Sequence, residues 1–211
     1  MRRLLLGVVL CLLLVPASGD ARNWERVVLT VEQSIVRFDM QFAEEFASCT
    51  GWSIDAVRGH FMTALHCYQP EPDLVADHIR IGDEPARLLW ISETLDVAIF
   101  SANLHRPTLP VRHSRIGIGK DIGVLGFGYG FPYPLFVSGN VAASGIDLPG
   151  APKAQHWFFA NFPYIQGMSG APVFNSNGEV VGIAQSSNYA VGWGRVIDPI
   201  FKASRHYWAE P

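Results

Sequence analysis

Hydrophobic residues along this chain fall mostly into short runs, separated by clusters of Gly, Pro, Asp and Glu. Several runs alternate with polar residues or are rich in β-branched side chains, a pattern that predicts β-strands. In the first half these runs are RVVLTVEQSIVRF, HIRIGD, ARLLWIS and DVAIF. In the second half they are IGVLGFG, PLFVSGNVAAS, HWFFANF, APVFN and EVVGIAQS, followed by a last strand around Gly192 to Val196.

Two local signals describe the end of the second series. The pair Asn177-Gly178, between APVF and EVVGI, is the strongest hairpin signal in the sequence and predicts that these two strands pair antiparallel. Only the C-terminus has a helical pattern, with Asp198 as a possible cap and Pro199 suited to the first turn. The helical stripe consists of Ile200, Phe201, Ser204, Tyr207 and Trp208.

The first series of strands ends near residues 115–120 (RIGIGK) and a second series begins, which indicates a domain boundary there. The 20 Gly and 14 Pro are scattered along the chain, which favours many short strands over long helices. We therefore predict an all-β fold of two packed six-stranded antiparallel β-barrels with a short C-terminal helix. The N-terminal barrel is expected at 25–117, and the C-terminal barrel with its helix at 118–211.

The first residues, MRRLLLGVVLCLLLVPASGDA, are expected to be a targeting segment and not part of the fold. Arg2 and Arg3 precede an apolar run from Leu4 to Val15, which is shorter than the roughly 20 residues that a membrane-spanning helix needs. Small residues at cleavage spacing predict a secretory signal peptide at 1–19, with 21 as an alternative end. An uncleaved anchor is the weaker alternative. The mature chain is therefore expected to be secreted or periplasmic, without stable membrane insertion.

Composition narrows the classes of function. Charged residues make up 17% of the chain, the net charge is −3, and no block of basic residues occurs, so nucleic-acid binding has no electrostatic support. Removal of the signal peptide removes Cys11 and leaves Cys49 and Cys67, and a single pair in an oxidising compartment predicts a disulfide. No C-x-x-C or H-E-x-x-H spacing is present, so we predict neither a metal nor a cofactor.

The stretch QGMSGAPVF places Ser169 between glycines ahead of an apolar run. A serine in such a turn can present its hydroxyl and nearby backbone N–H groups to one point, as an acyl-transfer nucleophile requires. Among seven histidines, His66 stands out because it ends an apolar segment directly before Cys67. Asp96 is the one acidic residue embedded in a strand-like apolar run, and a buried carboxylate requires a partner. Taken singly, each of these residues has an ordinary structural explanation.

Together, TALHC, DVAIF and GMSGAPV resemble the histidine, aspartate and serine motifs of the chymotrypsin-like (trypsin-fold) serine proteases, in the family's order. The second half, VSGNVAASG followed by GMSGAPVFNSNGEVVGIAQS, is most similar to the HtrA-like bacterial branch. The Cys49–Cys67 pair looks instead like the disulfide of secreted members. No residues remain after the terminal helix for the PDZ domain of full HtrA proteins, so we expect a trypsin-like peptidase domain at 20–211 without one.

The resemblance implies a serine endopeptidase that hydrolyses peptide bonds through an acyl-enzyme. Ser169 would be the nucleophile, His66 the base and Asp96 the residue that orients it. Backbone N–H groups of Gly167 and Ser169 would form the oxyanion hole. Met168 stands where these families usually have Asp or Asn, and a thioether cannot pair with a freed N-terminal amine, so we expect no zymogen activation of that kind.

By position, the substrate pocket is expected between two short segments and has no acidic residue at its floor, which argues against cleavage after Arg or Lys and favours an apolar preference. The predicted pocket residues are Pro163, Tyr164, Ile165, Gln185, Ser186 and Ser187. The expected partner is a protein or peptide substrate, and the sequence does not predict an oligomeric state. The alternative is a binding or adhesion module on the same fold that has little or no turnover.

Overall fold

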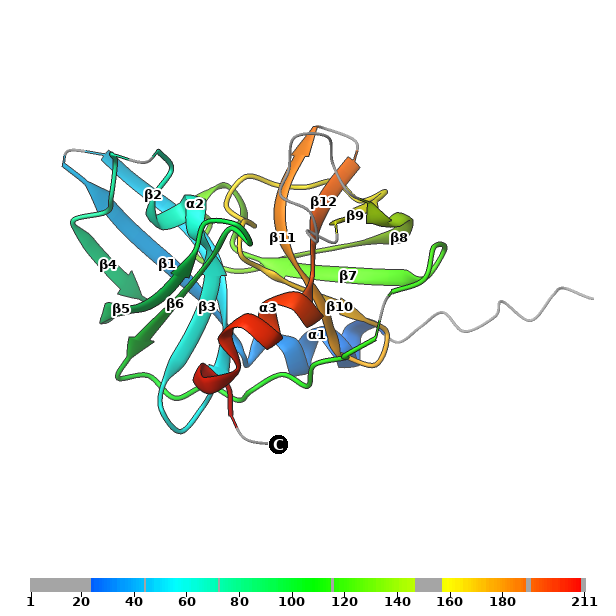
Figure 1. The fold of residues 1–211 in the computed structure, drawn as a ribbon, viewed down its shortest axis with the longest axis horizontal. Coiled ribbons are helices and arrows are strands. Elements are labelled where there is room, and N and C mark those ends of the chain that lie inside the picture. Colours follow the sequence, from blue (N-terminus) through cyan, green and yellow to red (C-terminus); the bar gives the residue numbers. More distant parts are fainter. Residues whose placement is uncertain are drawn as a thin grey trace, which may run out of the picture.

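Two β-barrels lie side by side in the computed structural model of the chain, which describes residues 24–43, 45–71, 73–114, 116–146, 157–188 and 191–209 (Figure 1). The predicted signal peptide at 1–19, with its alternative end at 21, lies outside the described residues. Each barrel closes from six antiparallel strands, so the predicted fold class is confirmed. In the described part of the chain, no helix is both long and apolar enough to cross a membrane.

The two barrels share one topology. The first has the strand order β1-β2-β3-β6-β5-β4 and the second the equivalent order β7-β8-β9-β12-β11-β10. The first barrel consists of β1 (Ile35–Phe42), β2 (Glu45–Asp55), β3 (His60–Ala64), β4 (His78–Ile81), β5 (Glu84–Ser92) and β6 (Val97–Ala102), with the short helix α2 (Leu65–Tyr68) after β3. The second consists of β7 (Asp121–Gly126), β8 (Leu135–Ile146), β9 (Trp157–Ala160), β10 (Pro172–Asn175), β11 (Val180–Asn188) and β12 (Val191–Val196), with the 3-10 helix η1 (Gly128–Gly130) after β7.

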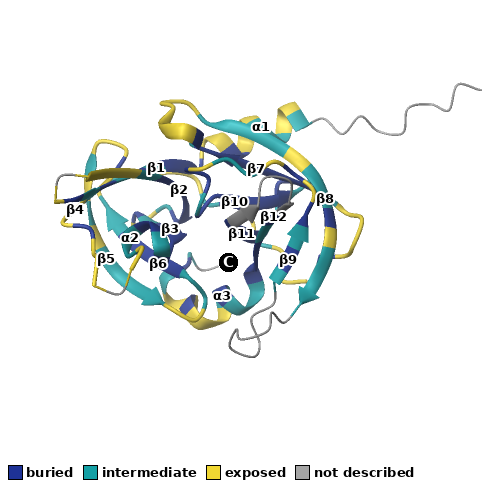
Figure 2. Cartoon of the chain, turned by 90° about the horizontal axis from the view of Figure 1, so that it is seen from above, coloured by how far each residue is buried: buried dark blue, intermediate teal, exposed yellow. Residues whose placement is uncertain are grey.

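Alternation along the strands fills the barrels. In β1, every second side chain from Val36 to Phe42 is buried, while Arg37 and Asp39 pair at 2.7 Å on the outer face. This is the period of two that a pleated strand imposes. In Figure 2 the buried residues lie inside both barrels and in the region between them. The hydrophobic pattern of β2 did not single it out as a strand, because its interior contains Thr50 and Ser53, whose hydroxyls bond to backbone carbonyls elsewhere in the chain.

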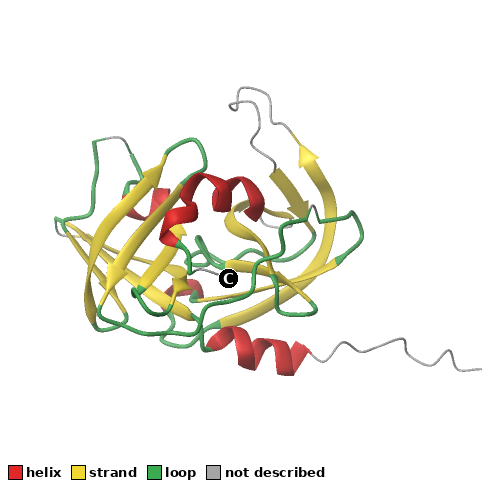
Figure 3. Cartoon of the chain, turned by 60° about the horizontal axis from the view of Figure 1, so that its bottom comes forward, coloured by secondary structure: helices red, strands yellow, loops and turns green. Residues whose placement is uncertain are grey.

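The N-terminal segment corrects one prediction. Residues 26–32 of the expected strand RVVLTVEQSIVRF belong instead to helix α1 (Trp24–Glu32), drawn in red in Figure 3 next to the grey N-terminal trace. Trp24, Val27, Val28 and Val31 face the core at the helical spacing of three and four residues. The β-branched composition suggested a strand, but the tertiary contact favours the helix, since Trp24 packs on Phe136 and Phe174 of the second barrel.

The first and last segments of the described chain each pack on the barrel that is remote in sequence. The C-terminal helix α3 (Ile197–Ser204) and the 3-10 helix η2 (Arg205–Tyr207) follow β12. Trp208 then packs edge-on against Trp52 of the first barrel, with 5.4 Å between the ring centroids. The predicted C-terminal helix is present, but it begins at Ile197 with Val196 at the cap position. Asp198 lies in the first turn and pairs with Lys202 at 2.7 Å.

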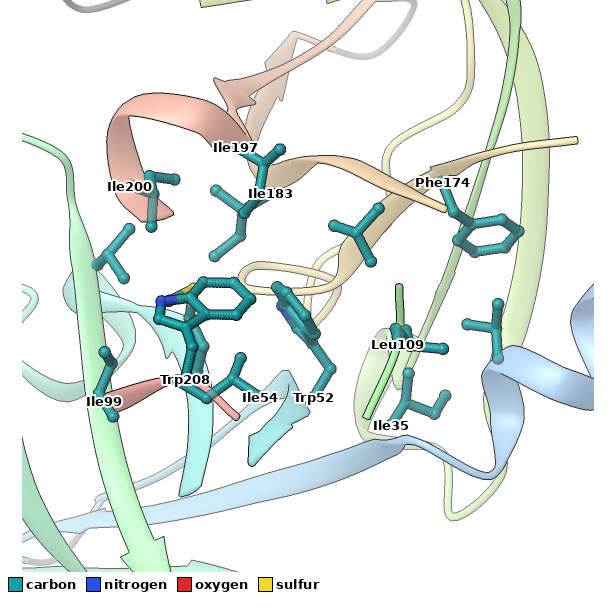
Figure 4. Close-up of a cluster of buried hydrophobic side chains, with 14 of the residues drawn as sticks. Ile35, Trp52, Ile54, Ile99, Leu109, Phe174, Ile183, Ile197, Ile200 and Trp208 are labelled. Carbon is teal, nitrogen blue, oxygen red and sulfur yellow. The ribbon is translucent and has the colours of Figure 1, made fainter. Parts of the chain in front are cut away.

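A hydrophobic core joins the two barrels (Figure 4). Trp52 and Ile54 of β2 meet Ile183 of β11 and Ile197 of α3 there, and all four are fully buried. Close packing of this kind holds segments that are distant in sequence at fixed separation. The predicted hairpin is also present, since β10 and β11 pair antiparallel around Gly178, whose φ is +80°.

Candidate active site

Three chain segments carry the predicted catalytic residues to the region between the barrels. His66 lies on α2, directly after β3, and Asp96 ends the turn between β5 and β6. Ser169 lies in the loop between β9 and β10. The first barrel thus supplies two of the side chains and the second supplies the third.

These three side chains form a continuous hydrogen-bonded chain. His66 Nδ1 lies 2.8 Å from Asp96 Oδ2, and His66 Nε2 lies 2.8 Å from Ser169 Oγ. The other oxygen of Asp96 accepts the backbone N–H of His66 at 2.9 Å. With its Nδ1–H donating a hydrogen bond to the carboxylate, the imidazole has a free lone pair on Nε2 and can accept the serine proton.

The backbone at Asp96 is held in an uncommon conformation, with φ at +52°. Asp tolerates this left-handed region better than most residues, but it still requires support from its surroundings. The carbonyl of Asp96 accepts the N–H of Leu65 at 3.1 Å, and the side chain of Gln185 donates to the carbonyls of both Leu95 and Asp96 at 2.8 and 2.9 Å. These bonds fix the turn that directs the carboxylate at His66.

A buried cation, the guanidinium of Arg195, binds the side-chain oxygen of Gln185. Arg195 Nε donates to Gln185 Oε1 at 3.0 Å, and the guanidinium lies 4.1 Å from the ring centroid of Trp157. Burial lowers the pKa of Arg195 to about 10, although the negative charge of Asp96 opposes the shift, so Arg195 stays charged at neutral pH. The aromatic face and the amide oxygen compensate part of the cost of burying this charge.

Two adjacent residues of β2 connect to both halves of the site. Cys49 forms the predicted disulfide with Cys67 and so joins β2 to the helix that carries His66. Thr50 N–H donates to the carbonyl of Ser169 at 3.0 Å. The Thr50 hydroxyl is buried, donates to the carbonyl of Gly167 at 2.9 Å and accepts the N–H of Phe127 at 2.8 Å.

The loop around Ser169 depends on two glycines. Gly167 has a φ of +97°, and Met168 N–H donates to Ile165 O at 3.0 Å, which is the geometry of a type II turn. The carbonyl of Gln166 accepts Tyr129 N–H at 2.7 Å, so the N–H of the same peptide, on Gly167, points the opposite way. Among the described residues, neither Gly167 N–H nor Ser169 N–H donates to a protein acceptor. Both are therefore available to a ligand.

Met168 is fully buried in the core of the second barrel, together with Ala171 and Val173. Its side chain thus anchors the turn by apolar packing. Gly170, with φ at +83°, sits so close to the first barrel that an added Cβ would lie 2.3 Å from Thr50 O.

The predicted pocket residues lie in two segments, one shortly before Ser169 and the other on β11. Tyr164 is nearest the chemistry, since its Oη lies 2.5 Å from Ser169 Oγ. Burial raises the pKa of the Tyr164 phenol far above its ordinary value, and the charge of Asp96 adds to the rise, so the hydroxyl keeps its proton. Pro163 is exposed and Ile165 half-buried. Ser186 and Ser187 lie on β11, where they pair with Trp193 and Gly192 of β12; their side chains lie outside what the structure describes.

Sequence reasoning missed the supporting roles of Thr50, Gln185 and Arg195. Gln185 was expected at the pocket edge; its backbone carbonyl does lie 3.5 Å from Ser169 Oγ, but its amide is turned toward the Asp96 turn. Polar residues inside apolar strands were the one available signal, since buried polar groups need partners. Among the described residues, no group of three or more His, Cys, Asp or Glu side chains could hold a metal ion.

Comparison with known proteins places this geometry in a family. The family model described as the trypsin-like peptidase domain matches residues 49–183. No curated protein sequence matches the chain.

Similar solved structures include the active form of the Rv3671c protease from M. tuberculosis, with 22% identity over 88% of this chain and 86% of that chain and a TM-score of 0.70. An inactive form of that protease has 22% identity over 87% of this chain and 93% of that chain, with a TM-score of 0.68. The HtrA-type protease AlgW, in a structure with a tripeptide, has 17% identity over 86% of this chain and 62% of that chain, with a TM-score of 0.76. At these identities the likeness shows a shared fold. The extent of the family match shows that the chain belongs to the trypsin-like peptidase family.

Proposed function

We propose that the chain is a secreted serine endopeptidase in which Ser169, His66 and Asp96 act as one catalytic triad. The observation that carries the proposal is the continuous chain of bonds from Asp96 through His66 to Ser169, with both separations at the imidazole equal to 2.8 Å. Nucleophile, base and orienting acid within hydrogen-bond reach are the signature of an activated serine. Secretion rests on the N-terminal segment of the sequence alone.

In the acylation step, Ser169 Oγ attacks the carbonyl carbon of the scissile bond while its proton passes to His66 Nε2. The electron pair of the carbonyl π bond moves to oxygen, and the N–H groups of Gly167 and Ser169 bind the resulting oxyanion. When the intermediate collapses, the C–N bond breaks and the leaving amine takes the proton from His66. Asp96 keeps the imidazole in the required tautomer and stabilises its cation.

Deacylation repeats these movements with water. His66 Nε2 takes a proton from a water molecule, whose oxygen attacks the acyl carbon. The bond to Ser169 Oγ then breaks, and His66 returns a proton to that oxygen. The products are a carboxylic acid, the amine released earlier and the regenerated serine.

A serine-directed fluorophosphonate probe tests the proposal. The oxidised wild-type protein is expected to be labelled at Ser169 and to digest casein, while Ser169→Ala should do neither. Absence of labelling in folded, oxidised wild type would favour the alternative of a binding module that has lost turnover.

A further inference from the structure

Tyr164 directs its hydroxyl at the proposed nucleophile. Its Oη lies 2.5 Å from Ser169 Oγ, which is closer than the 2.8 Å between Oγ and His66 Nε2. Since the imidazole accepts the Ser169 hydroxyl, the phenol is the donor in the contact with Oγ. This hydrogen bond keeps the Tyr164 ring beside the reacting oxygen.

A second ring lies in the same segment. Phe162 is fully buried and packs against β12 so closely that a Cβ added at Gly192 would be 2.5 Å from its Cε2 atom. Gly192 pairs with Ser187 of β11, so Phe162 lies against the strand next to the predicted pocket edge. On the other side of Tyr164, Ile165 is packed against Gly128, where an added Cβ would lie 2.5 Å from its Cγ2 atom. The segment that precedes Ser169 therefore packs bulky side chains against β12 and η1.

The geometry of attack places the substrate against these rings. The side chain of the residue before the scissile bond branches from the carbon next to the carbonyl that Ser169 attacks. It must therefore lie within a few bonds' length of Ser169 Oγ, where the Tyr164 ring already stands. A large side chain would have to displace Tyr164 and break its bond to Ser169, and close-packed surroundings resist such a change.

We propose that Tyr164 is the residue that determines primary specificity, and that it restricts cleavage to bonds preceded by small side chains such as Gly, Ala or Ser. This inference rests on the proposed function, because it assigns a substrate class to the same site. It replaces the apolar preference expected from the sequence by a preference for small residues.

A series of peptides that differ only in the residue before the cut (Gly, Ala, Val, Leu or Phe) tests this specificity. For the wild type we expect kcat/KM for Ala to exceed that for Leu and Phe by about 100-fold, the size of discrimination that side-chain volume gives. Tyr164→Ala should lower this ratio at least about tenfold by admitting Leu and Phe. Tyr164→Phe keeps the ring and should keep the preference.

Tyr133→Ala is the matched control, because Tyr133 is a tyrosine exposed on the loop between β7 and β8. It should leave the ratio unchanged. Two results would overturn the proposal: equal cleavage after Ala and Phe by the wild type, or the same Ala-to-Phe ratio in Tyr164→Ala as in the wild type. Should Tyr164→Ala not fold, Tyr164→Leu replaces it, and the preference of the wild type decides on its own.

Labelling of the same wild-type preparation with the fluorophosphonate probe separates the two hypotheses. If Ser169 is labelled and cleavage follows large residues, the proposed function stands and the role of Tyr164 is wrong. If Ser169 is not labelled, the proposed function fails and the specificity inference fails with it.

Discussion

The two barrels have the same strand order, yet they hold their parts of the site by different means. His66 and Asp96 of the first barrel are positioned through side chains: the Cys49–Cys67 disulfide beside α2 and the amide of Gln185, which reaches the Asp96 turn from β11 of the second barrel. The second barrel positions Ser169 largely through backbone, with Gly167 and Gly170 in the left-handed region. Loss of one side-chain interaction weakens the positioning of a catalytic residue only in part. A single Cβ added at a glycine with positive φ instead distorts the backbone that carries Ser169.

This difference predicts that the loop around Ser169 tolerates substitutions less well than the segments that carry His66 and Asp96. Gly170→Ala should have the largest effect on stability, because its Cβ would lie 2.3 Å from both Thr50 O and Thr63 Oγ1. Crowding and the positive φ together should cost about 4 kcal/mol of unfolding free energy. Urea unfolding measures it. Gly82→Ala is the control, since Gly82 also has a positive φ (+59°) but no atom within 4 Å of an added Cβ, and it should cost about 1 kcal/mol. Equal costs would contradict the clash.

The disulfide tests the first barrel. Cys49→Ala combined with Cys67→Ala removes a link across a sequence separation of 18 residues, and should cost about 3 kcal/mol by the loop-entropy estimate. Unfolding in urea with and without reductant measures it: reductant should destabilise the wild type but not the double variant. Unchanged stability of the wild type on reduction would show that the pair is not bonded in solution.

Thr50 tests the connection between the barrels. Thr50→Val leaves the carbonyl of Gly167 and the N–H of Phe127 without their buried partner, which should cost about 2 kcal/mol and lower kcat as the loop loosens. Thr63→Val is the buried control, since its hydroxyl donates to Thr50 O and does not touch Gly167. A loss of kcat that is no greater in Thr50→Val than in Thr63→Val would argue against a positioning role.

The ion pair between Asp55 and Arg58 lies away from the catalytic residues and is expected to have a smaller effect. Burial opposes ionisation, but hydrogen bonds from Arg58 and Val57 and the charge of Arg58 outweigh it and hold the pKa of Asp55 below its ordinary value. Arg58 in turn binds the carbonyls of His206 and Trp208. Asp55→Asn should cost about 1 kcal/mol at pH 7.

The pH dependence follows from the direction of that shift. A lowered folded-state pKa stabilises the protein above the unfolded value of about 4, and this contribution is lost as the pH falls through the folded pKa. The stabilities of wild type and Asp55→Asn should therefore converge below about pH 4. Asp198→Asn, which removes the partly exposed pairs with Lys202 at 2.7 Å and with His113 at 3.7 Å, should cost about 0.4 kcal/mol. A constant difference between wild type and Asp55→Asn from pH 7 to pH 3 would contradict this account.

Much of the fold was predictable because the signals were local. Alternation along the strands, the Asn177-Gly178 turn and the spacing around Ser169 each depend on a few neighbouring residues. Helix α1 was missed because its valines favour strands, and only the contact of Trp24 with Phe174, far along the chain, reveals its buried face.

The supporting shell of the site could not be predicted for a similar reason. The bonds of Gln185 to the carbonyls of Leu95 and Asp96 join residues about 90 positions apart. No local pattern marks such pairs, since their partners are set by how the barrels pack. The contact between Tyr164 and Ser169 spans only five residues, but it depends on the path of a loop that has no regular pattern.

The most direct test of the account is the rate at which the fluorophosphonate probe labels Ser169 in wild type, His66→Ala, Asp96→Asn and the double variant. If Asp96 acts only through His66, each single change should slow labelling by about 10³- to 10⁴-fold, and the double variant should be no slower than His66→Ala alone. Labelling that is unaffected by His66→Ala, or losses that multiply in the double variant, would contradict a single relay across the two barrels.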